Sequence, residues 1–129
     1  MPKSLTRTLV VALLLSFFPA AGTVAADPDV KTRQIFEKML SAAMANDRDA
    51  FVQFAIDPLK EAITKDVMAS VHETLGARLK KGYRSFYLCQ LKQRGLAVHL
   101  WKLTFKDDGD DVLIRLSLRD GKVEGFFFE

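Results

Sequence analysis

The spacing of apolar residues changes at Gly82, and this change constrains the fold more than any other feature of the chain. Before Gly82, apolar residues recur every three or four positions, as on the buried stripe of an amphipathic helix. After Gly82 they alternate, as in half-buried strands. From Pro28 to Ala45 the first pattern predicts a helix, with Asp27 as its N-cap and Pro28 as its first residue.

Two further helices are expected before Gly82. Asp47 can cap a short helix that carries Phe51 and Phe54, and Thr64 can cap a longer helix that ends near Lys81. Glycine at position 82 supplies the left-handed conformation that ends many helices. The longer helix has one apolar stripe, made of Val67, Met68, Val71, Leu75 and Leu79.

The second half of the chain predicts four strands, at about 84–93, 96–106, 112–118 and 122–128. Gly95 separates the first two, an acidic turn at 107–111 separates the middle pair, and Asp120-Gly121 is a strong signal for a tight hairpin. Three helices followed by an antiparallel meander predict an α+β domain, with the helices packed on one face of a four-stranded sheet.

The first 26 residues have the pattern of a secretory signal peptide. Lys3 and Arg7 give a basic start, Leu9 to Phe18 an apolar run, and Val24-Ala25-Ala26 small residues for cleavage before Asp27. The apolar run ends after ten residues, whereas a membrane-spanning helix needs about 20. We therefore expect residues 27–129 to form one exported domain, periplasmic or extracellular, with no membrane attachment after cleavage.

The charge of the expected mature chain argues against a nucleic-acid partner. The leader holds two of the 19 Lys and Arg residues and none of the 16 Asp and Glu residues, so residues 27–129 carry a net charge of +1. The local basic cluster of Arg78, Lys80, Lys81 and Arg84 lies at a predicted helix end, where cations stabilise the helix dipole. A nucleic-acid-binding domain would keep a larger basic excess.

The chain offers few residues for metal or redox chemistry. Cys89 is the only cysteine, so we expect a buried apolar role for it in a strand, without an intramolecular disulfide. The acidic turn at 107–111 lacks the spacing of a calcium-binding loop. The two histidines, His72 and His99, have no predicted third ligand. No cofactor and no metal are expected.

The element order, the helix-entry region from Leu59 to Met68, the exit at Gly82 into a strand, and the closing stretch 120–126 carry a resemblance to a known superfamily. From Asp47 to Phe128 the chain resembles a nuclear-transport-factor-2-like (cystatin-like) domain, in particular an uncharacterised family of small secreted domains sometimes fused to α/β-hydrolases. This resemblance implies a cone-shaped fold closed by a curved sheet. It implies no single reaction, because the superfamily includes ketosteroid isomerases, polyketide-cyclase-like enzymes and binding or dimerisation modules.

An isomerase of that superfamily implies a general-base carboxylate that faces an oxyanion hole of a tyrosine and a protonated aspartate. The acidic residues of this chain do not fit that pattern, because they fall in predicted turns and helix caps and only Glu124 lies within a strand. The remaining enzyme hypothesis is a small isomerase- or cyclase-like enzyme that uses His99 with Tyr87.

Strand alternation defines a candidate pocket and a candidate interface. The pocket set combines aromatic rings with a hydroxyl and an imidazole, as in an apolar ligand cleft, although ordinary core packing explains it more simply. Its members are Tyr87, Cys89, Leu91, His99, Trp101, Leu103 and Phe105. The interface set has the opposite parity and consists of Phe86, Leu88, Val98 and Leu100.

The interface set would leave apolar side chains on a sheet face that the helices cannot also cover. Exposed apolar faces of this kind are usually covered by a partner. We therefore expect a homodimer or a protein partner on this face. The favoured function is a noncatalytic exported module that binds a small apolar ligand or a protein partner through its sheet.

Overall fold

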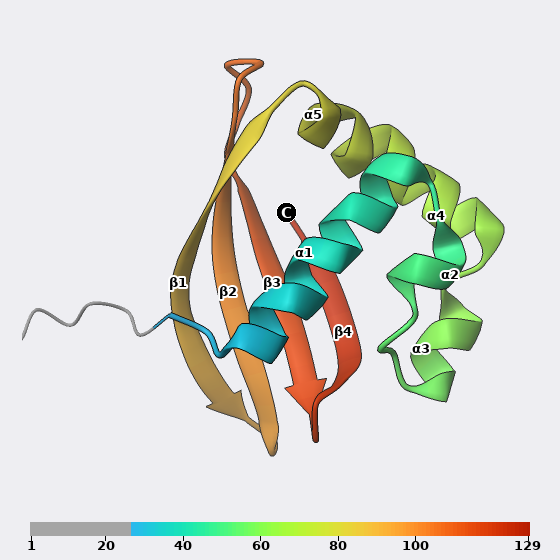
Figure 1. The fold of residues 1–129 in the computed structure, drawn as a ribbon, viewed down its shortest axis with the longest axis vertical. Helices are drawn as coiled ribbons and strands as arrows, with labels where there is room; N and C mark the ends of the chain where they lie inside the picture. The colour runs from blue at the N-terminus through green and yellow to red at the C-terminus, as the bar shows by residue number, and fades with distance from the viewer. Residues whose placement is uncertain (1–26) are drawn as a thin grey trace, which may run out of the picture.

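The computed structural model describes residues 27–129, and the predicted signal peptide lies outside the described residues. Helices precede strands along the chain, so the α+β class is confirmed (Figure 1). The elements are α1 (Val30–Ala45), α2 (Arg48–Phe51), α3 (Asp57–Ala62), α4 (Lys65–Val71), the π-helical segment η1 (His72–Gly76), α5 (Ala77–Lys80), β1 (Tyr83–Gln93), β2 (Leu96–Phe105), β3 (Val112–Arg119) and β4 (Lys122–Phe128).

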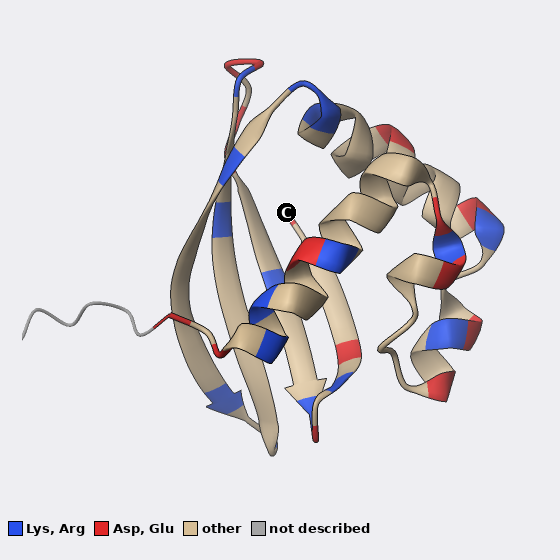
Figure 2. Ribbon diagram, viewed as in Figure 1, with Lys and Arg blue, Asp and Glu red and all other residues tan. Residues whose placement is uncertain are grey.

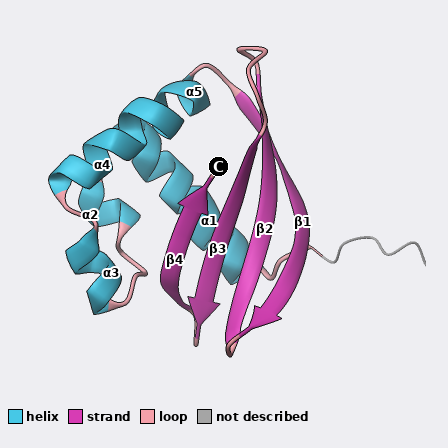
Figure 3. Cartoon of the chain, turned by 180° about the vertical axis from the view of Figure 1, so that it is seen from behind, coloured by secondary structure: helices cyan, strands magenta, loops and turns pink. Residues whose placement is uncertain are grey.

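The strands form one antiparallel sheet in the order β1-β2-β3-β4, as the alternation predicts. In Figure 1 α1 crosses in front of the strands, and from behind, in Figure 3, the strands lie in front of α1. The helices of residues 27–129 therefore cover one face of the sheet, called here the inner face. The opposite, outer face has no described helix over it. The curvature that the resemblance implies stays a prediction.

The first helix begins two residues later than expected. Asp29, not Asp27, is the N-cap of α1, because its carboxylate accepts a hydrogen bond from the backbone N–H of Thr32 at 2.6 Å. Asp27 instead forms an exposed ion pair with Arg33 at 3.5 Å. Pro28 consequently precedes the helix and is not its first residue.

The other predicted caps are confirmed. The side chains of Asp47 and Thr64 cap α2 and α4. A short additional helix, α3, begins at Asp57, and Ile56 precedes it without a side-chain cap. The predicted long third helix is α4, η1 and α5 in direct succession.

The π-helical turn places the long helix close against α1. The imidazole Nδ1 of His72 is hydrogen-bonded to the backbone oxygen of Ala43 at 2.9 Å. At Gly76 a β-carbon would collide with that same oxygen, so only glycine permits this approach. The π-helical turn therefore lies where the long helix makes its closest approach to α1.

The core lies between the inner sheet face and the helices. Its centre is a stacked pair, Phe36 of α1 on Trp101 of β2, with ring centroids 4.0 Å apart. The side chains with almost no exposed surface come from both layers: Ile35, Phe36, Met39, Leu40, Met68, Leu75, Leu79, Leu103, Ile114, Leu116 and Val123. Three of these lie on the predicted stripe of the third helix, whereas Val67 of that stripe is exposed.

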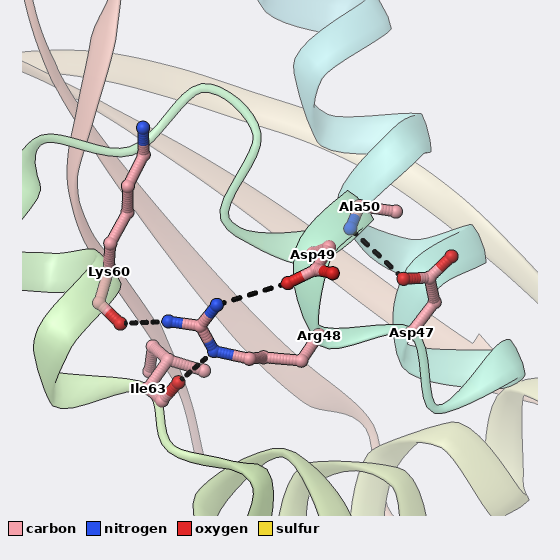
Figure 4. A network of polar contacts seen from close by, with 6 residues as sticks. All are labelled: Asp47, Arg48, Asp49, Ala50, Lys60 and Ile63. Atoms are coloured by element: carbon pink, nitrogen blue, oxygen red, sulfur yellow. Dashed lines mark hydrogen bonds and ion pairs between the residues drawn. The ribbon is translucent and has the colours of Figure 1, made fainter.

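Two arginines connect segments that are separate in the sequence. In Figure 4 the guanidinium of Arg48 donates to the backbone oxygens of Lys60 and Ile63 at the end of α3, at 2.5 and 2.7 Å. Arg78 of α5 binds the carboxylate of Asp107 in the acidic turn at 3.0 Å, and it lies over the Phe105 ring. These contacts give both arginines a structural role.

Candidate functional site

His99 and Tyr87 form a polar pair on the inner face of the sheet. The Tyr87 hydroxyl and Nδ1 of His99 are hydrogen-bonded at 2.9 Å. His99 is only 4% exposed, whereas Tyr87 is half-buried. The sequence hypothesis that joins these two residues therefore has a direct contact in its favour.

The surroundings of this pair favour its neutral form. Burial lowers the pKa of His99 below its ordinary value of 6.5, and the negative charge of Asp29 opposes this shift only in part. Burial likewise raises the pKa of Tyr87. At neutral pH the pair consists of an imidazole and a phenol, which can exchange a hydrogen bond but carry no charge.

A hollow of about 180 Å³ lies beside His99, between the start of α1 and the ends of the strands. Besides His99, its polar lining residues are Asp29, Lys31, Thr32, Gln90 and Asp120, and Tyr87 does not line it. The hollow is smaller than the roughly 300–1,000 Å³ of most ligand pockets. It has room for a very small molecule, with His99 but not Tyr87 at its wall.

Cys89 and Leu91 do not share the face of His99, so this part of the predicted pocket is wrong. Tyr87 pairs with Trp101, and the next pair is Cys89 with Leu100. Leu88 is therefore the extra residue of a β-bulge, and the side chains of β1 change face after it. Beyond the bulge Cys89 pairs with Leu100 and Leu91 with Val98 on the outer face. Gln90 takes the inner position opposite His99.

The other predicted pocket residues belong to the core. Trp101, Leu103 and Phe105 are buried among the side chains of the helices. Trp101 is stacked on Phe36, and Arg78 covers the Phe105 ring with its guanidinium carbon 3.8 Å from the ring centroid. These three side chains are therefore core residues, which was the simpler interpretation of the pocket set.

The candidate interface residues lie on the outer face, except that Leu88 is the extra residue of the bulge. Phe86 and Leu88 are each 39% exposed, while Val98 is buried at the base of a depression and Leu100 is partly exposed. Phe127 of β4 joins them and is 65% exposed. Apolar side chains therefore reach solvent from the first strand to the last.

The depression is a groove of about 650 Å³ on this outer face, here called the outer groove. Basic, amide and apolar side chains combine in it: Gln93, Arg94, Leu96, Val98, Arg115, Ser117 and Phe127. Val98 belongs to the predicted interface set, and the register puts Arg115 and Ser117 on the same face. Arg94 and Gln93 could not be assigned in advance, because a turn and a bulge set their directions.

Residues 27–129 were compared with the patterns of a metal-ligand cluster and of a membrane-spanning helix. Within residues 27–129 no group of three histidine, cysteine or acidic side chains is placed to hold a metal ion. No described helix is both long and apolar enough to cross a membrane.

A further hollow, of about 480 Å³, lies beside Asp47, Arg48 and Lys65 at the α1–α2 junction, where Asp47 already caps α2.

Comparisons with known proteins identify no family for this chain. No protein-family model matches it, and no curated protein matches it. Among solved structures, an uncharacterised cystatin-fold protein from Novosphingobium aromaticivorans is similar over 74% of this chain and 95% of that chain, with 14% sequence identity and a TM-score of 0.40. A likeness this distant carries no argument about function, and membership of the secreted family stays a prediction.

Proposed function

We propose that this protein is a noncatalytic exported module that binds a partner protein through the outer face of its sheet. One observation carries the proposal: apolar side chains are exposed on this face from β1 to β4. Phe86, Leu88, Leu91 and Phe127 are the exposed large apolar residues of the strands. Exposed large apolar side chains gathered on one sheet face are typical of an interaction surface.

A partner protein is a better occupant than a small ligand, because the exposed residues spread over a whole sheet face. A small ligand would be largely enclosed, with most of its surface buried in a concave pocket. The hollow at His99 is small, and the outer groove is open to solvent along the apolar face. A broad, shallow surface with aromatic side chains is typical of protein interfaces.

The proposal is tested by site-specific photocrosslinking with the full chain in its native host. A photoreactive phenylalanine analogue replaces Phe127, and the control places it at Val30, which is 73% exposed at the start of α1. The crosslinked protein is identified, purified and titrated against wild type and Phe86→Ser/Phe127→Ser. We expect adducts at position 127 alone and binding weakened about tenfold or more, since large apolar anchors dominate interfaces.

Equal adducts at positions 127 and 30, or unchanged binding by the double variant, would refute the proposal. An adduct between two copies of this chain would replace the partner protein with a homodimer.

The Tyr87–His99 hydrogen bond favours a second candidate function, a small isomerase- or cyclase-like enzyme. His99 would take the proton from the carbon between the carbonyl and the alkene and return it to the γ carbon, which moves the double bond into conjugation. Tyr87 would hold the imidazole in place through its hydrogen bond. The test follows the ultraviolet absorbance of conjugated enones formed from a panel of β,γ-unsaturated ketones. Turnover by wild type that is lost in His99→Gln supports the enzyme, and absence of turnover above buffer rejects it for this panel.

A further inference from the structure

We infer that the partner protein inserts an acidic, apolar segment into the outer groove, with a carboxylate held by Arg94 and Arg115 beside an apolar side chain in the groove. This inference rests on the proposed function and names the chemistry of the partner. It follows from the shape of the groove, from the charges at its rim, and from the poor fit of a second copy.

Small side chains in one row across the sheet create the groove. Val98 of β2 is opposite Ser117 of β3, which is opposite Gly125 of β4. At Gly125 a β-carbon would lie 2.9 Å from the Phe127 ring, so the ring leans over the glycine. The neighbouring row holds the larger Leu100, Arg115 and Phe127. The step between the two rows forms a depression about 650 Å³ in volume, with Phe127 as one apolar wall.

Two arginines that line the groove have no ion-pair partner within residues 27–129. Arg119 beside the turn is paired with Glu124 at 2.8 Å. Arg94 and Arg115 take part in no ion pair within residues 27–129. Two guanidinium groups beside an apolar wall match a carboxylate next to an apolar side chain, because arginine binds carboxylates through two parallel hydrogen bonds.

A second copy of the chain fits this surface less well. Figure 2 marks basic residues in blue on β1, β2 and β3. The strand register directs four of them to the outer face: Arg84, Lys102, Arg115 and Arg119. Glu124 already binds Arg119. Two such faces placed together would bring like charges into contact, and this costs binding energy. An acidic partner removes the repulsion.

The test pans a phage-displayed library of random peptides against the full chain. Peptides enriched on wild type are synthesised and titrated against three variants: Arg94→Glu/Arg115→Glu, Ser117→Leu, and the control Lys65→Glu/Lys80→Glu. The control reverses the same number of charges at exposed positions of α4 and α5. Ser117→Leu fills the groove without changing its charge, and circular dichroism verifies that each variant is folded.

We expect the enriched peptides to carry Asp or Glu next to an apolar residue. Arg94→Glu/Arg115→Glu should weaken their binding about tenfold, because the variant loses both guanidinium groups and repels the carboxylate. Ser117→Leu should also weaken it, and the lysine control should change it less than twofold.

Each other outcome has a definite meaning. Peptides that bind the arginine variant as well as wild type would overturn the acidic segment while the protein-binding face stands. Loss in the arginine variant but not in Ser117→Leu would overturn the groove as the site. Failure to enrich any peptide would overturn the inference. A dimer in sedimentation velocity that Phe127→Ser dissociates would assign the face to a second copy and overturn both proposals.

Discussion

Replacing Tyr87 with phenylalanine removes one hydroxyl and keeps the ring. That hydroxyl is the hydrogen-bond partner of Nδ1 of His99, at 2.9 Å. Because His99 is only 4% exposed, the freed nitrogen has little access to water. The remaining ring can keep its edge contact with Trp101, where the centroids are 5.1 Å apart, so little apolar packing is lost.

The expected cost follows from these contacts. A buried polar atom left without a partner destabilises a protein by about 1–3 kcal/mol. Tyr87 is itself half-buried, so water can approach from its exposed side, and we expect the lower part of that range, about 1–2 kcal/mol. In a domain of this size each kcal/mol lowers the melting temperature by roughly 4–8 °C.

The assay is urea unfolding followed by circular dichroism at pH 7.5, where His99 is neutral. The matched control is Tyr83→Phe. Tyr83 is the first residue of β1 and also lies on the inner face, opposite Phe105, but its hydroxyl has no side-chain hydrogen bond within residues 27–129. The control should change the free energy of unfolding by less than about 0.5 kcal/mol. Equal free energies for the two variants would refute the reasoning, since the hydrogen bond would then contribute nothing.

Three further predictions concern single residues. Burial lowers the pKa of His99, so protonation of His99 is less favourable in the folded state than in the unfolded state. The free energy of unfolding should therefore fall as the pH drops below 6.5 toward the folded pKa. His99→Phe should flatten this dependence in urea unfolding measured at pH 5–8. Gly76→Ala should lower the free energy of unfolding by about 2 kcal/mol or more, because its β-carbon collides with the backbone oxygen of Ala43, and a melt matching wild type would contradict this packing. Arg78 holds the pKa of Asp107 at about 2. In Arg78→Ala this pKa should rise toward its ordinary 3.8, as measured by carboxyl-carbon NMR, and an unmoved pKa would show that the backbone N–H of Gly109 suffices.

The strands could be predicted because their signals are local. Alternation of apolar residues and two positive-φ hairpin turns, Arg94-Gly95 and Asp120-Gly121, define where the strands meet. The helix caps Asp47 and Thr64 are equally local, since each side chain binds a backbone N–H three residues ahead. Asp27 and Asp29 show the limit of such signals, because two aspartates lie close to the start of α1 and the cap is Asp29, two residues beyond the predicted position.

The direction of the β1 side chains was not predictable in the same way. The bulge after Tyr87 places Cys89 and Leu91 on the outer face and turns Gln90 toward His99. A bulge adds one residue to one strand, and its position depends on the partner strand rather than on the local sequence. The predicted pocket therefore kept Tyr87 and His99 and lost its other β1 members.

By itself, the sequence determined the α+β class, the four strands and their hairpin order, because these follow from hydrophobic periodicity and turn residues that act over a few positions. Only the tertiary structure decided that His99 meets Tyr87, that a π-turn brings Gly76 against Ala43, and that a row of small residues opens the outer groove between Arg94 and Arg115. These features depend on register and side-chain volume across neighbouring elements, and a one-residue shift reverses every face.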